Sequence, residues 1–211
     1  MGKITKLVVC GPVGSGKTSL IEHCIYGNYF ERQPDDFVST SEDTYNAVVE
    51  TDRGSKEKVR IYDLGGTTKL ERHFVNCADA FILVYDVSDA KSFTAVQNLK
   101  QDIDKHREKR DLCVVLCCHK VDKLRDITLD TTEVSRWTQY EKVAGTFETT
   151  VHDRQSLINL FAWVVSRVNQ SQIGHFHRIE SALHCWKLSP SHYYNNNISK
   201  SGFSFGKKDA R

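Results

Sequence analysis

The sequence lacks a long hydrophobic run. A transmembrane helix needs about 20 consecutive apolar residues, and no stretch of the 211 residues approaches that length. The polar start Met1–Lys6 is followed by no apolar segment of the kind that a signal peptide contains. Residue 6 is lysine where the myristoylation pattern has serine or threonine, and Gly206–Arg211 contains no C-a-a-X box. We therefore expect a soluble, cytoplasmic protein without a membrane anchor.

The chain also lacks an excess of charge and any regular spacing of its cysteines. It has 29 basic and 27 acidic residues, a formal net charge of +2, which gives no argument for nucleic acid as a partner. Among its seven cysteines, Cys10, Cys113 and Cys117 lie in apolar runs. We interpret the cysteines as reduced thiols of a cytosolic protein. Cys117-Cys118-His119 has no second pair of ligands elsewhere, so we expect no metal there.

What the sequence does contain is a phosphate-binding loop. Residues Gly11–Thr18 read Gly-Pro-Val-Gly-Ser-Gly-Lys-Thr and match the pattern G-x-x-x-x-G-K-T. An apolar strand over residues 4–10 precedes this loop, and a helical pattern over residues 18–26 follows it. Backbone N–H groups and the helix dipole therefore converge on anionic oxygens at this helix N-terminus.

The residues of this phosphate loop have different expected roles. Glycines let the backbone wrap closely around phosphates, Lys17 reaches the outer phosphates, and the Thr18 hydroxyl binds Mg²⁺. We expect the following residues to bind the nucleotide: Gly11, Val13, Gly14, Ser15, Gly16, Lys17, Thr18 and Ser19.

The rest of the first 170 residues alternates between apolar runs and helical patterns. Strands are predicted over residues 4–10, 45–51, 57–63, 80–86, 112–118 and 145–148, and helices over 18–26, 88–109, from 131 and over 156–169. This order predicts an α/β fold of the P-loop NTPase class, with a mostly parallel six-stranded sheet flanked by helices. Residues 171–211 include three consecutive asparagines, and we predict a mostly disordered tail. Its aromatic residues could instead dock onto the domain or a partner.

A carboxylate stands where a P-loop protein needs its second metal contact. Asp63 ends a predicted strand and is followed by Leu64, Gly65 and Gly66. An aspartate at a strand end is often only a turn or cap residue. Because the chain also contains a phosphate loop, we interpret Asp63 as a residue that holds Mg²⁺ through water. We interpret the Gly66 amide as a donor to the terminal phosphate.

Five segments in this order resemble the motifs of the Ras-like small GTPases over roughly residues 3–170. They are the phosphate loop, a switch I around Thr40, Asp63–Gly66, Cys118–Asp122 and Glu148–Val151. The resemblance implies a Ras-like G domain over residues 1–170 that binds GTP or GDP with Mg²⁺. Within it, the Thr40 hydroxyl would bind the metal and the Thr40 amide would touch the γ-phosphate.

The same resemblance assigns recognition of the base. Asp122 would accept hydrogen bonds from guanine N1–H and N2, a pairing that rejects adenine, and Lys120 would lie over the ring. His119 replaces the asparagine of most members. Its imidazole can donate to guanine N7, but it lacks the second polar group of an amide. The loss of one such hydrogen bond weakens binding by about 0.5–1.5 kcal/mol. The other implied contacts are the amides of Thr150 and Val151 at guanine O6 and a stacked Tyr29, or alternatively Phe30.

Two residues depart from the Ras pattern beside the γ-phosphate. Thr67 replaces the glutamine that orients the attacking water, and a threonine hydroxyl is too short for that task. Val13 replaces the second glycine of the loop and would fill the space of an arginine finger, which is worth about 10³–10⁵ in rate. We predict slow or impaired GTP hydrolysis. The alternatives are a cycling GTPase whose partner completes the catalytic site and a P-loop phosphotransferase, for which no acceptor region or arginine-rich lid is recognised.

Within the small GTPases the chain resembles the kappaB-Ras subfamily, Ras-like proteins that interact with inhibitors of NF-kappaB. The resemblance is carried by Tyr26–Asn28, Glu42–Asp43, Val49–Gly54, Glu141–Val143, and Asp153–Arg154 with Leu157–Ile158. It implies a regulator of NF-kappaB and/or Ral GTPase signalling. The implied protein partners, bound through switch I, are the beta-type inhibitor of NF-kappaB and the Ral GTPase-activating complex.

Overall fold

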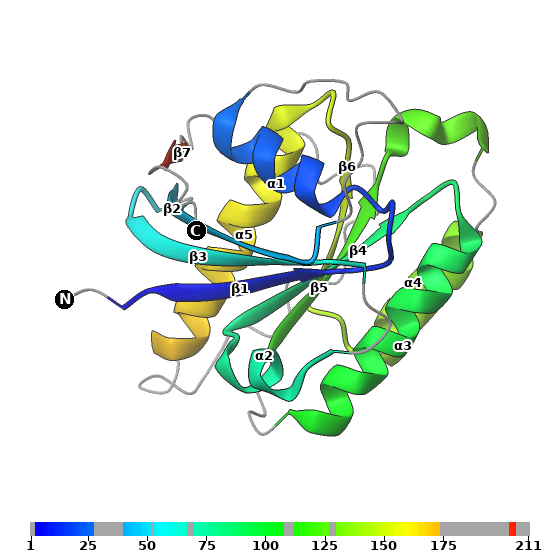
Figure 1. Ribbon diagram of the computed structural model, residues 1–211, viewed down its shortest axis with the longest axis horizontal. Helices are drawn as coiled ribbons and strands as arrows, with labels where there is room; N and C mark the ends of the chain where they lie inside the picture. Colours follow the sequence, from blue (N-terminus) through cyan, green and yellow to red (C-terminus); the bar gives the residue numbers. More distant parts are fainter. Residues whose placement is uncertain are drawn as a thin grey trace.

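One mixed β-sheet forms the centre of the fold in a computed structural model of the protein. The structure describes residues 3–27, 40–51, 53–66, 70–107, 112–126, 130–173 and 203–205. Within these residues the sheet has seven strands in the order β6-β5-β4-β1-β3-β2-β7 (Figure 1). The strands are β1 (Thr5–Cys10), β2 (Glu42–Glu50), β3 (Lys56–Leu64), β4 (Ala80–Asp86), β5 (Cys113–His119), β6 (Gly145–Thr149) and β7 (Phe203–Phe205).

Helices cover both faces of this sheet. They are α1 (Lys17–Tyr26), α2 (Arg72–Cys77), α3 (Ala90–His106), α4 (Thr131–Tyr140) and α5 (Arg154–Ile173), with a 3₁₀ helix, η2 (Val121–Asp126). Figure 1 shows α1 and α5 on one face, and α2, α3 and α4 on the other. No helix among the described residues combines the length and apolar character needed to cross a bilayer.

Parallel pairing brings five strand ends to one edge of the sheet. β1, β3, β4, β5 and β6 pair in parallel, whereas β2 runs antiparallel to β3. Ligands of open α/β sheets bind beyond the carboxyl ends of such strands. The register of β1 with β3 places Val9 opposite Asp63. Asp63 therefore lies beside the start of the phosphate loop, although the two are more than 50 residues apart in sequence.

The hydrophobic core consists of two clusters, one on each face. Leu20 of α1 and Phe161 of α5 belong to the first cluster, and Phe74 of α2 and Phe93 of α3 belong to the second. Every residue of β4 is buried because this central strand is covered on both sides. Continuous apolar runs are typical of such strands, and this is why the sequence predicts β4 with its observed bounds.

The six predicted strands are confirmed, and β7 is a seventh. β7 comes from the segment 171–211 and pairs antiparallel with β2, with Phe205 opposite Ala47 and Phe203 opposite Val49. α5 continues to Ile173, three residues past the predicted end of the domain. The predicted disorder of the tail otherwise concerns residues 174–202 and 206–211, which lie outside the described residues.

Candidate nucleotide-binding site

The phosphate loop joins the end of β1 to the start of α1, and two of its glycines are dictated by close packing. A Cβ atom at Gly11 would lie 2.1 Å from the Val84 carbonyl oxygen of β4. A Cβ atom at Gly16, where φ is +90°, would lie 2.6 Å from the His119 ring. Side chains at these two positions would therefore collide with the sheet and with the end of β5.

Lys17 is held across this loop. Its ammonium group donates hydrogen bonds to the carbonyl oxygens of Gly11 and Pro12, each at 2.9 Å. Burial lowers the pKa of Lys17, and the nearby Asp63 carboxylate opposes that shift. The loop thus holds a largely buried cation at the helix N-terminus, where anionic phosphate oxygens are favoured.

Three oxygen-bearing side chains from distant parts of the chain meet next to Lys17. The Oγ1 atoms of Thr18 and Thr40 are 3.0 Å apart, and Thr18 Oγ1 donates to Asp63 Oδ2 at 2.5 Å. Asp63 is fully buried, and its Oδ1 atom has no hydrogen-bond partner among the described residues. Burial raises the pKa of Asp63 to about 6, against the hydrogen bond from Thr18 and the charge of Lys17.

This oxygen set fits a hard cation such as Mg²⁺. Mg²⁺ prefers oxygen ligands, retains several waters and is typically bound by one or two carboxylates together with substrate phosphates. The unpartnered Asp63 oxygen is an acceptor that such an ion or its water would satisfy. No cluster of three or more His, Cys, Asp or Glu side chains suited to a metal occurs in the described part of the chain. The set at Thr18 instead combines one carboxylate with two hydroxyls.

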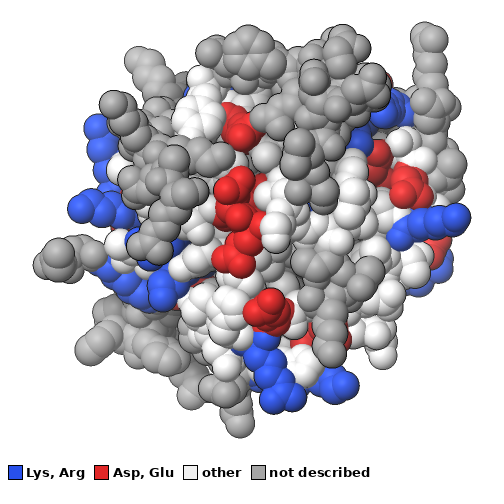
Figure 2. Space-filling model, viewed as in Figure 1, with Lys and Arg blue, Asp and Glu red and all other residues white. Residues whose placement is uncertain are grey.

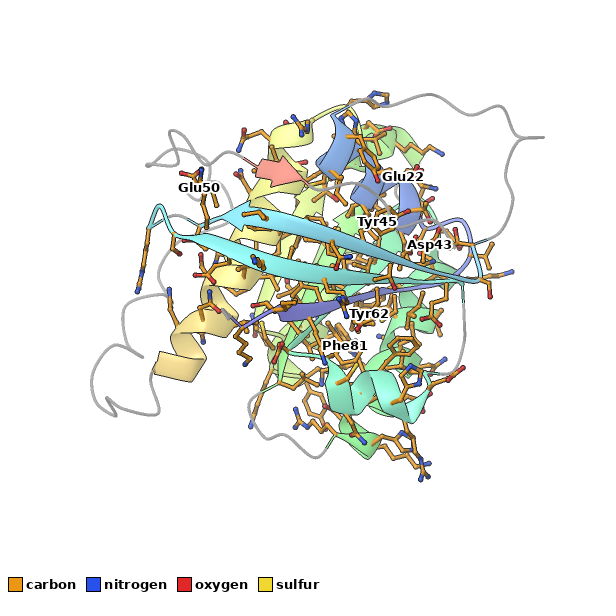
Figure 3. All side chains as sticks on the ribbon, turned by 60° about the vertical axis from the view of Figure 1, so that its left-hand side comes forward. Glu22, Asp43, Tyr45, Glu50, Tyr62 and Phe81 are labelled. Carbon is orange, nitrogen blue, oxygen red and sulfur yellow. The ribbon has the colours of Figure 1, made fainter. Side chains whose placement is uncertain are left out.

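Carboxylates around this cluster make its surroundings acidic. Tyr45 of β2 is buried and donates from its hydroxyl to Glu22 Oε1 of α1 at 3.4 Å. Figure 3 shows Tyr45 between Glu22 and Asp43. Burial raises the pKa of Tyr45, and the charges of Glu22, Asp63 and Asp43 raise it further. A cation bound at Asp63 would therefore be stabilised by charge beyond its direct ligands.

Gly65 and Gly66 follow Asp63 and begin the segment that we call switch II, and they pack tightly against switch I and the phosphate loop. The Gly65 amide donates to the Ser41 carbonyl at 2.9 Å. A Cβ atom at Gly66 would lie 2.1 Å from Val13 Cγ2 and 2.3 Å from Val13 N. The Val13 side chain therefore lies directly against Gly66, in the space beside the expected γ-phosphate, and is still 69% exposed. Thr67, the next residue after Gly66, lies outside the described residues, as do Tyr29 and Phe30.

His119 is a buried link between three segments. Its Nδ1 atom is 2.8 Å from Thr149 Oγ1 of β6, which is itself 3.1 Å from Cys117 Sγ. The ring packs on Gly16 of the phosphate loop. Burial, together with the charge of Lys120, lowers the pKa of His119 to about 4. The imidazole is therefore neutral at physiological pH, and only its Nε2 atom is left for the predicted contact with the base.

Lys120 connects β5 with the phosphate loop. Its backbone has a left-handed φ of 63°, and its ammonium group donates to the Gly14 carbonyl at 2.6 Å and to Asp86 Oδ2 at 2.8 Å. Burial would raise the pKa of Asp86, but hydrogen bonds from Lys120 and Ser88 outweigh it and hold that pKa below its usual value. The ionised Asp86 thus fixes Lys120 over the mouth of the loop.

Asp122 joins the two segments assigned to the base. Its Oδ1 atom accepts a short hydrogen bond from the Thr150 hydroxyl, and its Oδ2 atom is 3.8 Å from His152 Nε2. Burial raises the pKa of Asp122, but the Thr150 hydrogen bond more than compensates and keeps it below its usual value. A carboxylate ionised in this way can accept hydrogen bonds from guanine N1–H and N2. Thr150 and Val151 directly follow β6, beside Asp122.

The sequence does not predict the contact that Arg154 makes with α1. Arg154 begins α5, three residues after Val151, and donates from Nη2 to the Cys24 carbonyl at 2.9 Å and from Nε to the His23 carbonyl at 3.2 Å. It therefore ties the start of α5 to the end of α1. A lone arginine at a helix start has no pattern that indicates such a contact.

The charge distribution on the surface agrees with the small net charge. Figure 2 shows acidic side chains gathered near the middle of the viewed face and Lys and Arg mainly around its rim. No continuous basic surface is seen on this face among the atoms of described residues.

The fold and this site define a P-loop nucleotide-binding protein of the α/β class. A family model described as "Ras family" matches residues 6–170. The chain belongs to the Ras family, whose members bind guanine nucleotides.

Relatives within this family confirm the expected subfamily. The chain is 39% identical to NF-kappa-B inhibitor-interacting Ras-like protein 1 of Homo sapiens over 175 residues, which cover 82% of the chain and 90% of the relative. It is 38% identical to NF-kappa-B inhibitor-interacting Ras-like protein 2 of Homo sapiens and 39% identical to NF-kappa-B inhibitor-interacting Ras-like protein 1 of Danio rerio. Both matches again cover 82% of the chain and 90% of the relative. This chain is thus a Ras-like GTPase related to the NF-kappa-B inhibitor-interacting Ras-like proteins.

Proposed function

We propose that this chain is a GTP-binding signalling protein of the cytoplasm that hydrolyses GTP slowly and acts mainly by binding partner proteins. The observation that carries the proposal is the contact of Val13 with Gly66. The Val13 side chain fills the space between the phosphate loop and switch II that the transition state of hydrolysis and an arginine finger would occupy.

The binding half of the site supports retention of GTP with Mg²⁺. Lys17 would contact the outer phosphates, and Thr18, Thr40 and Asp63 would hold Mg²⁺ directly or through water. The metal would supply neutralisation of the phosphate charge. These four side chains already lie within hydrogen-bonding distance of one another or of the loop backbone, so little reorganisation is needed when the nucleotide binds.

The catalytic half of the site is the impaired one. Val13 branches at Cβ and lies against Gly66, so an arginine side chain from an activating protein would have to displace it. Thr67 lacks the side-chain amide of glutamine, which can orient the attacking water and contact the γ-phosphate at the same time. Positioning of the nucleophile and electrostatic stabilisation supply almost all catalysis in phosphoryl transfer, and these two residues weaken both.

The names of the relatives motivate the proposed partners. Proteins 39% and 38% identical to this chain are named for interaction with an inhibitor of NF-kappa-B. We therefore propose that switch I of this chain binds the beta-type inhibitor of NF-kappaB, and that the chain also associates with the Ral GTPase-activating complex. Both associations rest on the subfamily resemblance. A pull-down with each purified partner tests them, and the Thr40→Ala variant should bind less if switch I is the contact.

The nucleotide that copurifies with the protein tests the resting state. Purified protein is denatured and its nucleotide is separated by chromatography. We expect GTP to be recovered, because hydrolysis is slow relative to purification. Recovery of GDP alone would favour the cycling GTPase, and recovery of ATP would favour the phosphotransferase.

Restoring the two missing catalytic features should accelerate hydrolysis. A Val13→Gly, Thr67→Gln double variant is expected to raise the single-turnover rate about tenfold or more, since a positioned catalytic side chain contributes on the order of 10²–10⁴. Hydrolysis is followed as phosphate release from preloaded protein. Thr94→Gln, at an exposed position of α3, is the control and should leave the rate unchanged. An unchanged rate in the double variant would show that these residues do not restrain the chemistry.

A further inference from the structure

Asp86, the last residue of β4, is held in one orientation by the turn that follows it. Its Oδ1 atom accepts hydrogen bonds from the Ser88 amide at 2.9 Å and from the Ser88 hydroxyl at 2.6 Å. Its backbone amide donates to the Ser92 hydroxyl at 3.0 Å, and Ser92 is buried. β4 is buried along its whole length, so Asp86 is anchored to the centre of the sheet. Its second carboxylate oxygen, Oδ2, faces Lys120.

Lys120 connects this anchor to the phosphate loop. Its ammonium group donates to Asp86 Oδ2 at 2.8 Å and to the Gly14 carbonyl at 2.6 Å. The side chains of Asp86 and Lys120 are only 13% and 25% exposed, so water screens this ion pair less than a surface pair. The Lys123 amide donates to the Lys120 carbonyl at 2.9 Å and closes the left-handed turn there. Asp86, Lys120 and Gly14 thus form a continuous connection, which we call the Asp86 bridge.

The Asp86 bridge joins the two halves of the candidate site. Gly14 belongs to the loop that is expected to bind the phosphates, and Lys120 belongs to the segment Cys118–Asp122 that is expected to bind the base. A ligand that contacts both halves can leave in small steps if the halves move apart. While the bridge is closed, the contacts to both halves must break nearly together, which makes dissociation slow. Differences in affinity between related complexes lie mostly in such dissociation rates.

The charge of Asp86 is what makes this bridge strong. Hydrogen bonds that involve ionised groups are roughly twice as strong as those between neutral groups. Among the described residues, Lys120 Nζ has two hydrogen-bond partners, and only Asp86 of the two is charged. Without the carboxylate charge, the ammonium group would keep only neutral partners at a position largely removed from water. It would then gain by turning outward to solvent, and the contact with Gly14 would open.

We propose that Asp86 is a positioning residue for nucleotide retention. Through Lys120 it keeps the phosphate loop and the base-binding segment together, and it thereby sets how slowly a guanine nucleotide dissociates. The inference rests on the proposed binding of guanine nucleotide with Mg²⁺, and it goes beyond the proposed function because it concerns release and not hydrolysis. It applies to GDP and GTP alike, since the bridge ends on the backbone of Gly14 and not at the γ-phosphate.

Release of a fluorescent nucleotide tests this role. Full-length protein is loaded with N-methylanthraniloyl-GDP and Mg²⁺, excess unlabelled GDP is added, and the decay of fluorescence gives the dissociation rate. Asp86→Asn keeps the size of the side chain and removes its charge. It is expected to raise the rate about fivefold or more. The same increase is expected with a non-hydrolysable labelled analogue of GTP.

Asp104→Asn is the matched control. Asp104 forms an ion pair with the buried Lys100 near the far end of α3, so the substitution breaks a comparable pair away from the candidate site. It should lower the melting temperature of the loaded protein and leave the dissociation rate within about twofold of the wild type. An increase equal to that of Asp86→Asn would mean general loosening of the fold and would overturn the proposal.

A double substitution assigns the effect to the Asp86 bridge. In a Lys120→Gln background, Asp86→Asn should raise the rate by less than about twofold, because the partner of the carboxylate is already gone. An undiminished effect in that background, or a rate of Asp86→Asn equal to that of the wild type, would overturn the proposal. If Asp86→Asn does not fold, Ser88→Ala decides, since an unchanged rate there has the same meaning. Failure of the wild type to take up labelled GDP would instead contradict the proposed nucleotide binding itself, so the two failures are distinguishable.

Discussion

His119 is a buried imidazole whose protonation opposes folding. Burial lowers its pKa to about 4 in the folded protein, from 6.5 as the ordinary value. Between pH 6.5 and pH 4 this residue therefore carries more protons in the unfolded chain than in the folded one, and its contribution to the free energy of unfolding falls as the pH falls. The raised pKa of Asp63 acts with the opposite sign below about pH 6. One pKa unit corresponds to about 1.4 kcal/mol, so this group accounts for a loss of about 1–3 kcal/mol. Urea unfolding at pH 7, 6, 5 and 4.5 measures it.

A substitution assigns that loss to the residue. His119→Asn should lose about 1–3 kcal/mol less stability than the wild type between pH 6.5 and 4.5, because an amide does not titrate there. His73→Asn is the control, since His73 is exposed at the start of α2, and it should keep the dependence of the wild type. A slope in His119→Asn equal to that of the wild type would rule out His119 as its source.

At the scale of elements, α1 and α5 are joined by Arg154 as well as by their apolar faces. Arg154 donates to the carbonyls of His23 and Cys24, which lie in the last turn of α1. The His23 carbonyl also accepts from the Gly27 amide. Hydrogen bonds from a charged donor contribute about 1.5–3 kcal/mol, so Arg154→Gln should lower the free energy of unfolding by about that amount. Urea unfolding at pH 7 checks this. Arg167→Gln, an exposed arginine of the same helix, should change stability by less than about 0.5 kcal/mol; equal effects would contradict the role of Arg154.

At the scale of the whole molecule, the proposed nucleotide would bridge loops that come from both ends of the domain. A ligand that binds only the folded state at 100 times its Kd stabilises that state by about 2.7 kcal/mol. Mg²⁺ with GDP should therefore raise the melting temperature, and Mg²⁺ with ADP at the same concentration should not. Asp122→Ala should remove most of the difference, whereas Asp102→Ala on α3 should retain it. Equal stabilisation by both nucleotides would contradict recognition of guanine through Asp122.

The parts of the fold that the sequence predicts best are those with local, continuous signals. β4 is an unbroken apolar run, and Gly11–Thr18 carries its glycines, Lys17 and Thr18 within one turn between a strand and a helix. Such segments depend on neighbours in sequence. β7 was missed because three alternating residues in a polar tail are too short to stand out. Its strand character comes from the free edge of β2, which belongs to another part of the chain.

The candidate site divides in the same way. By itself the sequence determined which groups are available: the phosphate loop, the carboxylates of Asp63 and Asp122, the imidazole at position 119 and the valine at position 13. Only the tertiary structure decided which of them meet. The β1–β3 register brings Asp63 to Thr18, the β5–β6 register sets His119 opposite Thr149, and the approach of switch II lays Gly66 on Val13. Contacts between residues 30 or more positions apart depend on how strands align, and local spacing carries no information about that alignment.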